Sequence, residues 1–244
     1  MNNLKLNNLK LNNLKLNTIK TKVDLSKLVL DDKKILGSGA FGHVYKAYNG
    51  KNMNNRLVAK KTFKSVGLQL FSLIVNGHLQ GTMFKKEVDA LKYLSKLGIA
   101  PKIYFSDADK MIYVIEKLDY TLTEMLRKNK FKAIHLKRLT DIFKLVKTTP
   151  FKHNDLHSSN IMYSEKKNKF YIIDWGIFNI EKSCMVNTST KKSKKTKAKN
   201  CYNFNKKNVV YLSDLFLYIN KKKKTDKQMN KNYKLFLELF VLDN

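Results

Sequence analysis

The residue types best suited to catalysis are concentrated in one short segment, residues 153–160, which reads His-Asn-Asp-Leu-His-Ser-Ser-Asn. Within it, Asp155 can accept the proton of a hydroxyl group, and Asn160 follows five residues later. Asp174 comes fourteen residues after Asn160, at the end of an apolar run and two residues before Gly176. Mg²⁺ binds oxygen ligands, and the side chains of aspartate and asparagine supply them. This spacing therefore predicts a general base beside an oxygen-rich magnesium site.

A glycine-rich segment earlier in the chain is suited to binding phosphate. Residues 37–42 read Gly-Ser-Gly-Ala-Phe-Gly and are followed by His43 and Val44. Glycines let the backbone approach phosphates closely, with amide groups pointing inward. A tight turn without a ligand is one alternative. A dinucleotide fingerprint is another, but it needs a helix directly after the loop, and residues 44–48 predict a strand.

Two adjacent lysines follow on a predicted strand, in the sequence Val58-Ala59-Lys60-Lys61. Because side chains alternate between the faces of a strand, only one of the two can point inward. Lys61 is the better candidate to meet phosphates, and Glu87 on the next predicted helix could pair with it. Solvent exposure is the alternative for a lysine taken alone.

Short strands and amphipathic helices must position these residues. The pattern of β-branched and aromatic residues predicts an antiparallel meander around the glycine-rich segment. Apolar residues at helical spacing predict the helices, the first of which ends at Gly98. The predicted strands are residues 28–35, 44–48, 56–63, 102–105, 111–115, 161–163 and 170–173. The predicted helices are residues 84–97, 121–127, 136–146, 209–219 and 233–242, the last two separated by the lysine run 221–224.

The chain is strongly basic, with 49 Lys and Arg against 19 Asp and Glu among 244 residues and a formal net charge of +30. Such a surface attracts phosphate-rich or acidic partners, although A+T-rich coding would also produce this excess of lysine. With 43% hydrophobic residues the chain can bury a core, which excludes wholesale disorder. Residues 1–22, with three copies of Asn-Asn-Leu-Lys-Leu, predict a low-complexity tail. Residues 182–213, with nine lysines and no acidic residue, predict a solvated loop.

Taken together, the three motifs resemble the protein-kinase-like superfamily over residues 28–219. The resemblance implies an α+β, two-lobed fold, with an antiparallel-sheet N-lobe at residues 23–118 and a reduced helical C-lobe at residues 119–244. It also implies ATP and Mg²⁺ as cofactors. In the nucleotide site, the resemblance implies that Lys61 binds the phosphates and pairs with Glu87, that Glu116 to Leu118 form the adenine-binding hinge, and that ATP is covered by Gly37, Ser38, Gly39, Ala40, Phe41, Gly42 and Val44. In the catalytic site, it implies that Asp155 is the catalytic base and that Asn160 and Asp174 are Mg²⁺ ligands. It also implies that Asp214 braces the catalytic loop.

The departures from the common protein-kinase pattern are also informative. Asn154 stands where many kinases have arginine, which removes the receptor for an activation-loop phosphate. His157 replaces a lysine beside the transferred phosphate, and Trp175 replaces a phenylalanine. No Ala-Pro-Glu follows, and only 68 residues remain after Gly176. These features resemble atypical and viral kinases, and His-Asn-Asp in particular resembles choline-kinase-like enzymes.

The resulting hypothesis is an ATP- and Mg²⁺-dependent serine/threonine protein kinase, with acidic protein substrates docking on the lysine-rich segment. The alternatives are a small-molecule phosphotransferase and a nucleotide-binding pseudokinase. The lysine-rich surface also predicts unspecific contact with nucleic acid. Cys184 and Cys201 are too few for a disulfide framework, and no apolar stretch is long enough to span a bilayer. We therefore expect a cytoplasmic location without a membrane partner. The resemblance to viral kinases implies that this would be a host cytoplasm or a virion.

Overall fold

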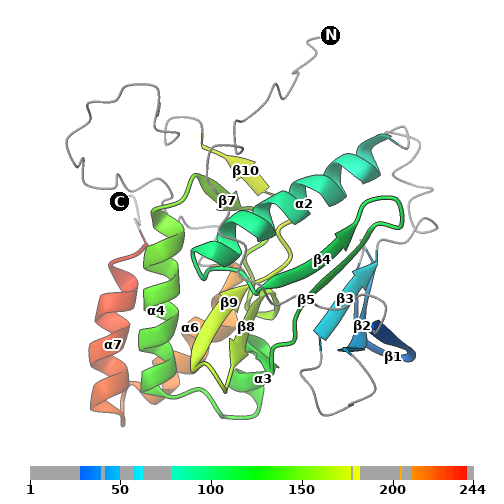
Figure 1. Cartoon of the computed structure of the whole chain (residues 1–244). Helices are drawn as coiled ribbons and strands as arrows, with labels where there is room; N and C mark the ends of the chain where they lie inside the picture. Colours follow the sequence, from blue (N-terminus) through cyan, green and yellow to red (C-terminus); the bar gives the residue numbers. More distant parts are fainter. Residues whose placement is uncertain are drawn as a thin grey trace.

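The computed structural model describes residues 28–39, 42–49, 58–62, 78–176, 178–181, 204 and 210–240. These residues form antiparallel sheets and helices, so the predicted α+β class is confirmed. Figure 1 shows the sheet of the first strands beside helix α2, with the later helices gathered at the other end of the molecule. Three predicted features lie outside the described residues: the low-complexity tail, Ala40 and Phe41, and nearly all of the lysine-rich segment.

The first part of the chain forms a five-stranded antiparallel sheet in the order β1-β2-β3-β5-β4. Its register opposes Gly39 to Gly42, so the glycine-rich segment is the end of the β1–β2 hairpin. Strand β1 therefore runs four residues beyond its predicted end. The same register opposes Lys61 to Val44 on one side and to Tyr113 on the other. The strands are β1 (Leu28–Gly39), β2 (Gly42–Asn49), β3 (Val58–Thr62), β4 (Ile103–Asp107) and β5 (Ile112–Glu116).

Helix α2 (His78–Lys96) connects β3 to β4 and packs along this sheet. It begins six residues before the predicted start at residue 84. Its buried residues include Phe84, Glu87, Leu91 and Leu94, whose spacing of three to four residues places them on one face of the helix. Gly98 then adopts φ 71°, a left-handed conformation that ends the helix as predicted.

The rest of the chain is mainly helical and carries two small sheets. Strands β6 (Tyr120–Thr121), β8 (Ile161–Ser164) and β9 (Lys169–Ile172) form one sheet, and β7 (Phe151–His153) pairs with β10 (Phe178–Ile180) in the other. The sequence patterns did not predict β6, β7 or β10, because strands of two or three residues carry no periodicity. The helices are α3 (Leu122–Arg127), α4 (Ala133–Lys147), the 3₁₀ turn η3 (Ser158–Asn160), α6 (Ser213–Lys222) and α7 (Lys227–Leu237).

The last two helices correct the predicted boundaries. Helix α6 continues through Lys221 and Lys222, so only Lys223 and Lys224 of the predicted lysine run lie between the two helices. Helix α7 begins at Lys227, six residues before the predicted start at residue 233, and ends at Leu237. Its start is set by Asp226, whose carboxylate accepts a hydrogen bond from the Met229 N–H.

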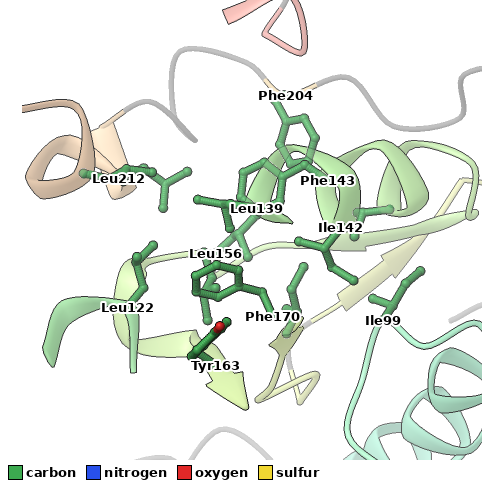
Figure 2. Packing of buried hydrophobic residues seen from close by; sticks show 14 of the residues in the cluster. Ile99, Leu122, Leu139, Ile142, Phe143, Leu156, Tyr163, Phe170, Phe204 and Leu212 are labelled. Atoms are coloured by element: carbon green, nitrogen blue, oxygen red, sulfur yellow. The ribbon is translucent and has the colours of Figure 1, made fainter. Parts of the chain in front are cut away.

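The main hydrophobic core joins α2 and β5 to the later helices and small sheets (Figure 2). A separate small cluster, at Ala47 and Val114, lies in the five-stranded sheet. Phe143 of α4 stacks on Phe204 with ring centroids 4.8 Å apart. Leu156, from the segment that carries the candidate catalytic residues, is fully buried in the same core. Because Leu156 lies between Asp155 and His157, its burial holds both neighbours at the edge of the core. Across the described part of the chain, no helix has both the length and the apolar composition needed to span a bilayer.

Candidate active site

The segment from His153 to Asn160 forms a tight loop held by its own hydrogen bonds. The Asp155 N–H donates to Nδ1 of His153 over 3.2 Å. The Asn160 side-chain amide donates to the Asp155 main-chain oxygen over 2.8 Å and lies 3.5 Å from the Asp155 carboxylate. The Asp155 side chain remains 44% exposed, whereas Asn160 is buried. The structure therefore brings Asp155 and Asn160 together and leaves the carboxylate accessible.

His153 connects this loop to the strand that leads to Asp174. Its Nδ1 accepts from Asp155, so Nε2 carries the proton and donates to the Ile173 main-chain oxygen over 2.8 Å. Burial lowers the pKa of His153, with the Ile173 hydrogen bond opposing the shift. The imidazole also packs edge-on against Trp175, with ring centroids 4.6 Å apart. His153 is therefore a neutral, buried link between the two parts of the site.

Asp174 lies in a turn that the structure holds firmly. The Ile173 N–H donates to the Asn160 main-chain oxygen over 2.9 Å, which joins the two candidate metal ligands through the backbone. Asp174 itself has φ 59°, the left-handed region that few non-glycine residues adopt. The buried Trp175 indole follows and donates to the Ile172 oxygen over 3.0 Å. These contacts place Asp174 beside the loop that carries Asp155 and Asn160.

Glu87 approaches the same place from helix α2. A Cβ atom built on Gly176 would lie 3.7 Å from Oδ1 of Asp174 and 3.7 Å from Oε2 of Glu87, so both carboxylates flank Gly176. Glu87 is fully buried and accepts a hydrogen bond from the Tyr113 hydroxyl over 2.7 Å. Burial raises the pKa of Tyr113 well above its usual value, and the charges of Glu87 and Asp174 raise it further. The site therefore brings the buried Glu87 carboxylate and the partly exposed Asp174 carboxylate to the same glycine.

His157 lies beside the candidate base. Its Nδ1 accepts a hydrogen bond from the Ser159 N–H over 3.2 Å, so the proton is on Nε2 in the neutral ring. That Nε2 is 3.6 Å from a carboxylate oxygen of Asp155. The imidazole of His157 is 37% exposed and faces the same open side as Asp155.

The predicted hinge is attached to the β8–β9 hairpin. Glu116 pairs with Lys167 over 2.6 Å, and its main-chain N–H donates to the Lys102 oxygen over 2.8 Å. Leu118 is buried, and the Asp119 N–H donates to the Tyr163 oxygen over 2.9 Å. The Glu116 carboxylate is thus paired with a lysine of the β8–β9 turn, and adenine binding by the main chain of this linker stays a prediction.

Sequence comparison identifies one similar curated protein, a probable serine/threonine-protein kinase of fowlpox virus (strain NVSL). The two are 28% identical over 156 residues, covering 59% of this chain and 51% of the relative. The predicted protein-kinase-like resemblance is confirmed. The chain spans about half the length of this curated relative. No family model matches the chain.

The resemblance assigns Mg²⁺ binding to Asn160 and Asp174. No cluster of three or more His, Cys, Asp or Glu side chains within the described ranges has the arrangement of a metal site. Asn160 and Asp174 fit an ion that keeps water and nucleotide phosphates as its other ligands, because Mg²⁺ commonly takes only one or two protein side chains. Asp174 is also close to the buried Glu87, which adds negative charge at this position.

Sequence reasoning anticipated Asp214 but missed its partners. The Ser158 hydroxyl donates to Asp214, and Oγ of Ser158 lies 2.7 Å from Oγ1 of Thr123. Asp214 also accepts from the Leu215 N–H at the start of α6. These contacts tie the candidate catalytic segment, residues 153–160, to helices α3 and α6. Tyr113 was missed as well, although a tyrosine within the apolar strand β5 is a signal that its hydroxyl needs a buried partner.

Proposed function

We propose that this chain is an ATP- and Mg²⁺-dependent protein kinase that transfers the γ-phosphoryl group of ATP to serine or threonine hydroxyls. The observation that carries the proposal is the convergence of Asp155, Asn160 and Asp174 around the buried His153. The similarity to the fowlpox virus kinase supports the same activity class. A host cytoplasm or virion is the setting that this viral relative favours.

The proposal includes a two-lobed arrangement. Residues 23–118, with the five-stranded sheet and α2, would form the nucleotide-covering lobe, and residues 119–244 would form the lobe that carries the catalytic loop. The hinge would be Glu116 to Leu118, where the chain passes from β5 toward β6. The glycine-rich end of the β1–β2 hairpin, from Gly37 to Gly42, would lie over the phosphates.

Each residue has a role that its surroundings support. Asp155, exposed and oriented by Asn160, would orient the acceptor hydroxyl and accept its proton. Asn160 and Asp174 would hold Mg²⁺, which when bound offsets negative charge on the phosphates. Lys61 would bind the phosphates. Its register opposite Tyr113 supports the choice of Lys61 over Lys60, because directly paired residues share a face of an antiparallel sheet.

One observation favours the small-molecule alternative. His157 occupies the position beside Asp155 where protein kinases usually have a lysine. A histidine at this position also occurs in small-molecule kinases, including the choline-kinase-like pattern that the motif resembles. We favour protein acceptors because the described helices after Asp174 are only α6 and α7, which offer little structure for a full small-molecule pocket. Acidic protein substrates and unspecific nucleic-acid contact remain proposals that rest on the lysine-rich composition.

The test is transfer of radiolabel from γ-labelled ATP in the presence of Mg²⁺. Acceptors would be an acidic protein, a basic protein and a panel of small alcohols. We expect Asp155→Asn to lower the rate on protein by roughly 10²–10⁴-fold, because it removes the general base. The matched control is Asp141→Asn on the exposed side of α4, which should leave the rate unchanged.

The acceptor decides between the alternatives. Label on protein that depends on Asp155 supports the protein kinase, and label on small alcohols alone supports the small-molecule phosphotransferase. ATP binding without any transfer supports the pseudokinase. Wild-type rates in Asp155→Asn would contradict the assignment of the base.

A further inference from the structure

The Tyr113 side chain places a hydroxyl group inside the apolar part of strand β5. Tyr113 is 2% exposed, and its neighbours in β5 are Ile112, Val114 and Ile115. Burying a phenol costs free energy unless its hydroxyl finds a partner. Here the partner is the fully buried carboxylate of Glu87, 26 residues earlier in the chain and 2.7 Å away. A phenylalanine would fill the same space in the core. The presence of the hydroxyl group therefore needs an explanation other than packing.

The hydroxyl determines how the Glu87 carboxylate is turned. Tyr113 donates to Oε1, while Oε2 lies toward Gly176, next to Asp174. The pKa of Tyr113 is raised well above its usual value, chiefly by burial, so the phenol keeps its proton and remains a donor throughout the neutral range. The second carboxylate oxygen is therefore held on the side of the site where Asp174 lies.

Two contacts attach Tyr113 to helix α2. The hydroxyl bonds to Glu87, and the ring packs against Phe84, with centroids 6.0 Å apart. Phe84 and Glu87 are three residues apart and lie on the same face of α2. In β5, Tyr113 is directly opposite Lys61 of β3. Tyr113 thus connects helix α2, which carries Glu87, to strand β5, which pairs with the strand that carries Lys61.

We propose that Tyr113 is a positioning residue for phosphate binding: its hydroxyl fixes the Glu87 carboxylate so that Glu87 can hold the Lys61 ammonium on the nucleotide phosphates. This rests on the proposed kinase function. Tyr113 does not touch the nucleotide in this arrangement and acts through Glu87. Its loss affects the part of the affinity that depends on the phosphates and spares the part that depends on adenine and ribose.

The test compares Tyr113→Phe with wild type for binding of ATP with Mg²⁺ and of adenosine, and for kcat/KM with respect to ATP. The variant removes one hydroxyl and keeps the ring. We expect kcat/KM and the ratio of ATP to adenosine affinity to fall about tenfold, as for loss of a hydrogen bond to a charged group. Adenosine affinity should stay within about twofold. In the Glu87→Gln background the same substitution should change the ratio less than about twofold, because the substituted side chain carries no charge to hold the Lys61 ammonium and its orientation no longer matters.

Tyr163→Phe is the matched control. The Tyr163 hydroxyl also donates over 2.7 Å, to Asn168 in the β8–β9 turn, and lies outside the proposed site. It should leave the affinity ratio unchanged. If Tyr113→Phe fails to fold, Tyr113→Met fills the core without a hydroxyl and provides the same comparison.

The outcomes separate the inference from the function. An unchanged ratio in Tyr113→Phe, an equal loss of ATP and adenosine affinity, or additive effects with Glu87→Gln would each overturn the positioning role and leave the kinase proposal in place. A wild-type protein that binds ATP no better than adenosine and transfers no phosphoryl group would overturn the proposed function, and the inference with it.

Discussion

Ser158 links the candidate catalytic loop, residues 153–160, to helix α6, and its replacement by alanine tests how that loop is held. Its hydroxyl donates to the Asp214 carboxylate and lies 2.7 Å from Oγ1 of Thr123, while the residue itself is only 5% exposed. A hydrogen bond to a charged group contributes about 1.5–3 kcal/mol. Asp214 is half-buried and also accepts from the Leu215 N–H, so water can replace part of the lost contact. We therefore expect Ser158→Ala to cost about 1.5–2 kcal/mol.

Ser159→Ala is the control for this prediction, because the neighbouring serine is exposed and its hydroxyl lies 3.0 Å from the same threonine. Its cost should stay within about 0.5 kcal/mol, as for most surface substitutions. Urea denaturation followed by circular dichroism would measure the free energy of unfolding of both variants. In a thermal scan, Ser158→Ala should lower Tm by about 3–8 °C. Equal costs for the two serines would refute the view that Asp214 holds the loop through Ser158.

Three further predictions concern stability. Burial lowers the pKa of both His153 and His135 in the folded chain. Below the usual histidine pKa, the unfolded chain therefore binds more protons than the folded chain. The free energy of unfolding should therefore fall as pH drops below about 6.5, which urea denaturation at about pH 7 and about pH 5.5 would show. Thr121→Val removes the side-chain half of a capping box with Glu124 and should cost about 1 kcal/mol in the same assay; no change would contradict the cap. Gly98→Ala puts a Cβ at φ 71° and should lower stability by about 1–2 kcal/mol, whereas an unchanged Tm would contradict that strain.

Local patterns predicted much of the fold. The alternation of β-branched and aromatic residues predicted the strands that became β1 to β5, and helical spacing predicted α2, α3 and α4. The predicted helix boundaries differ from the observed ones where a capping residue sets the start of the helix. Helix α7 begins six residues early because Asp226 caps it, although its apolar residues are concentrated farther along.

The sequence by itself also determined the candidate catalytic set. Asp155 and Asn160 are close in sequence, so the loop between them sets their spacing through bonds such as Asn160 to the Asp155 oxygen. Asp174 could be assigned to the same site because a single hairpin, β8–β9, lies between it and Asn160. The pairing of β8 with β9 brings the two ends of that hairpin together. Motifs of this kind are visible in a sequence because the chain itself keeps their residues near one another.

Only the tertiary structure decided which groups support that set. The hydrogen bond from Tyr113 to Glu87 joins residues 26 positions apart, and the one from Ser158 to Asp214 joins residues 56 positions apart. No spacing rule connects such residues, because their distance depends on how α2 packs on β5 and how α6 packs beside the catalytic loop. A tyrosine or serine in the sequence shows that a hydroxyl needs a partner. The partner is known only when the packing of distant elements places one acceptor within hydrogen-bonding distance.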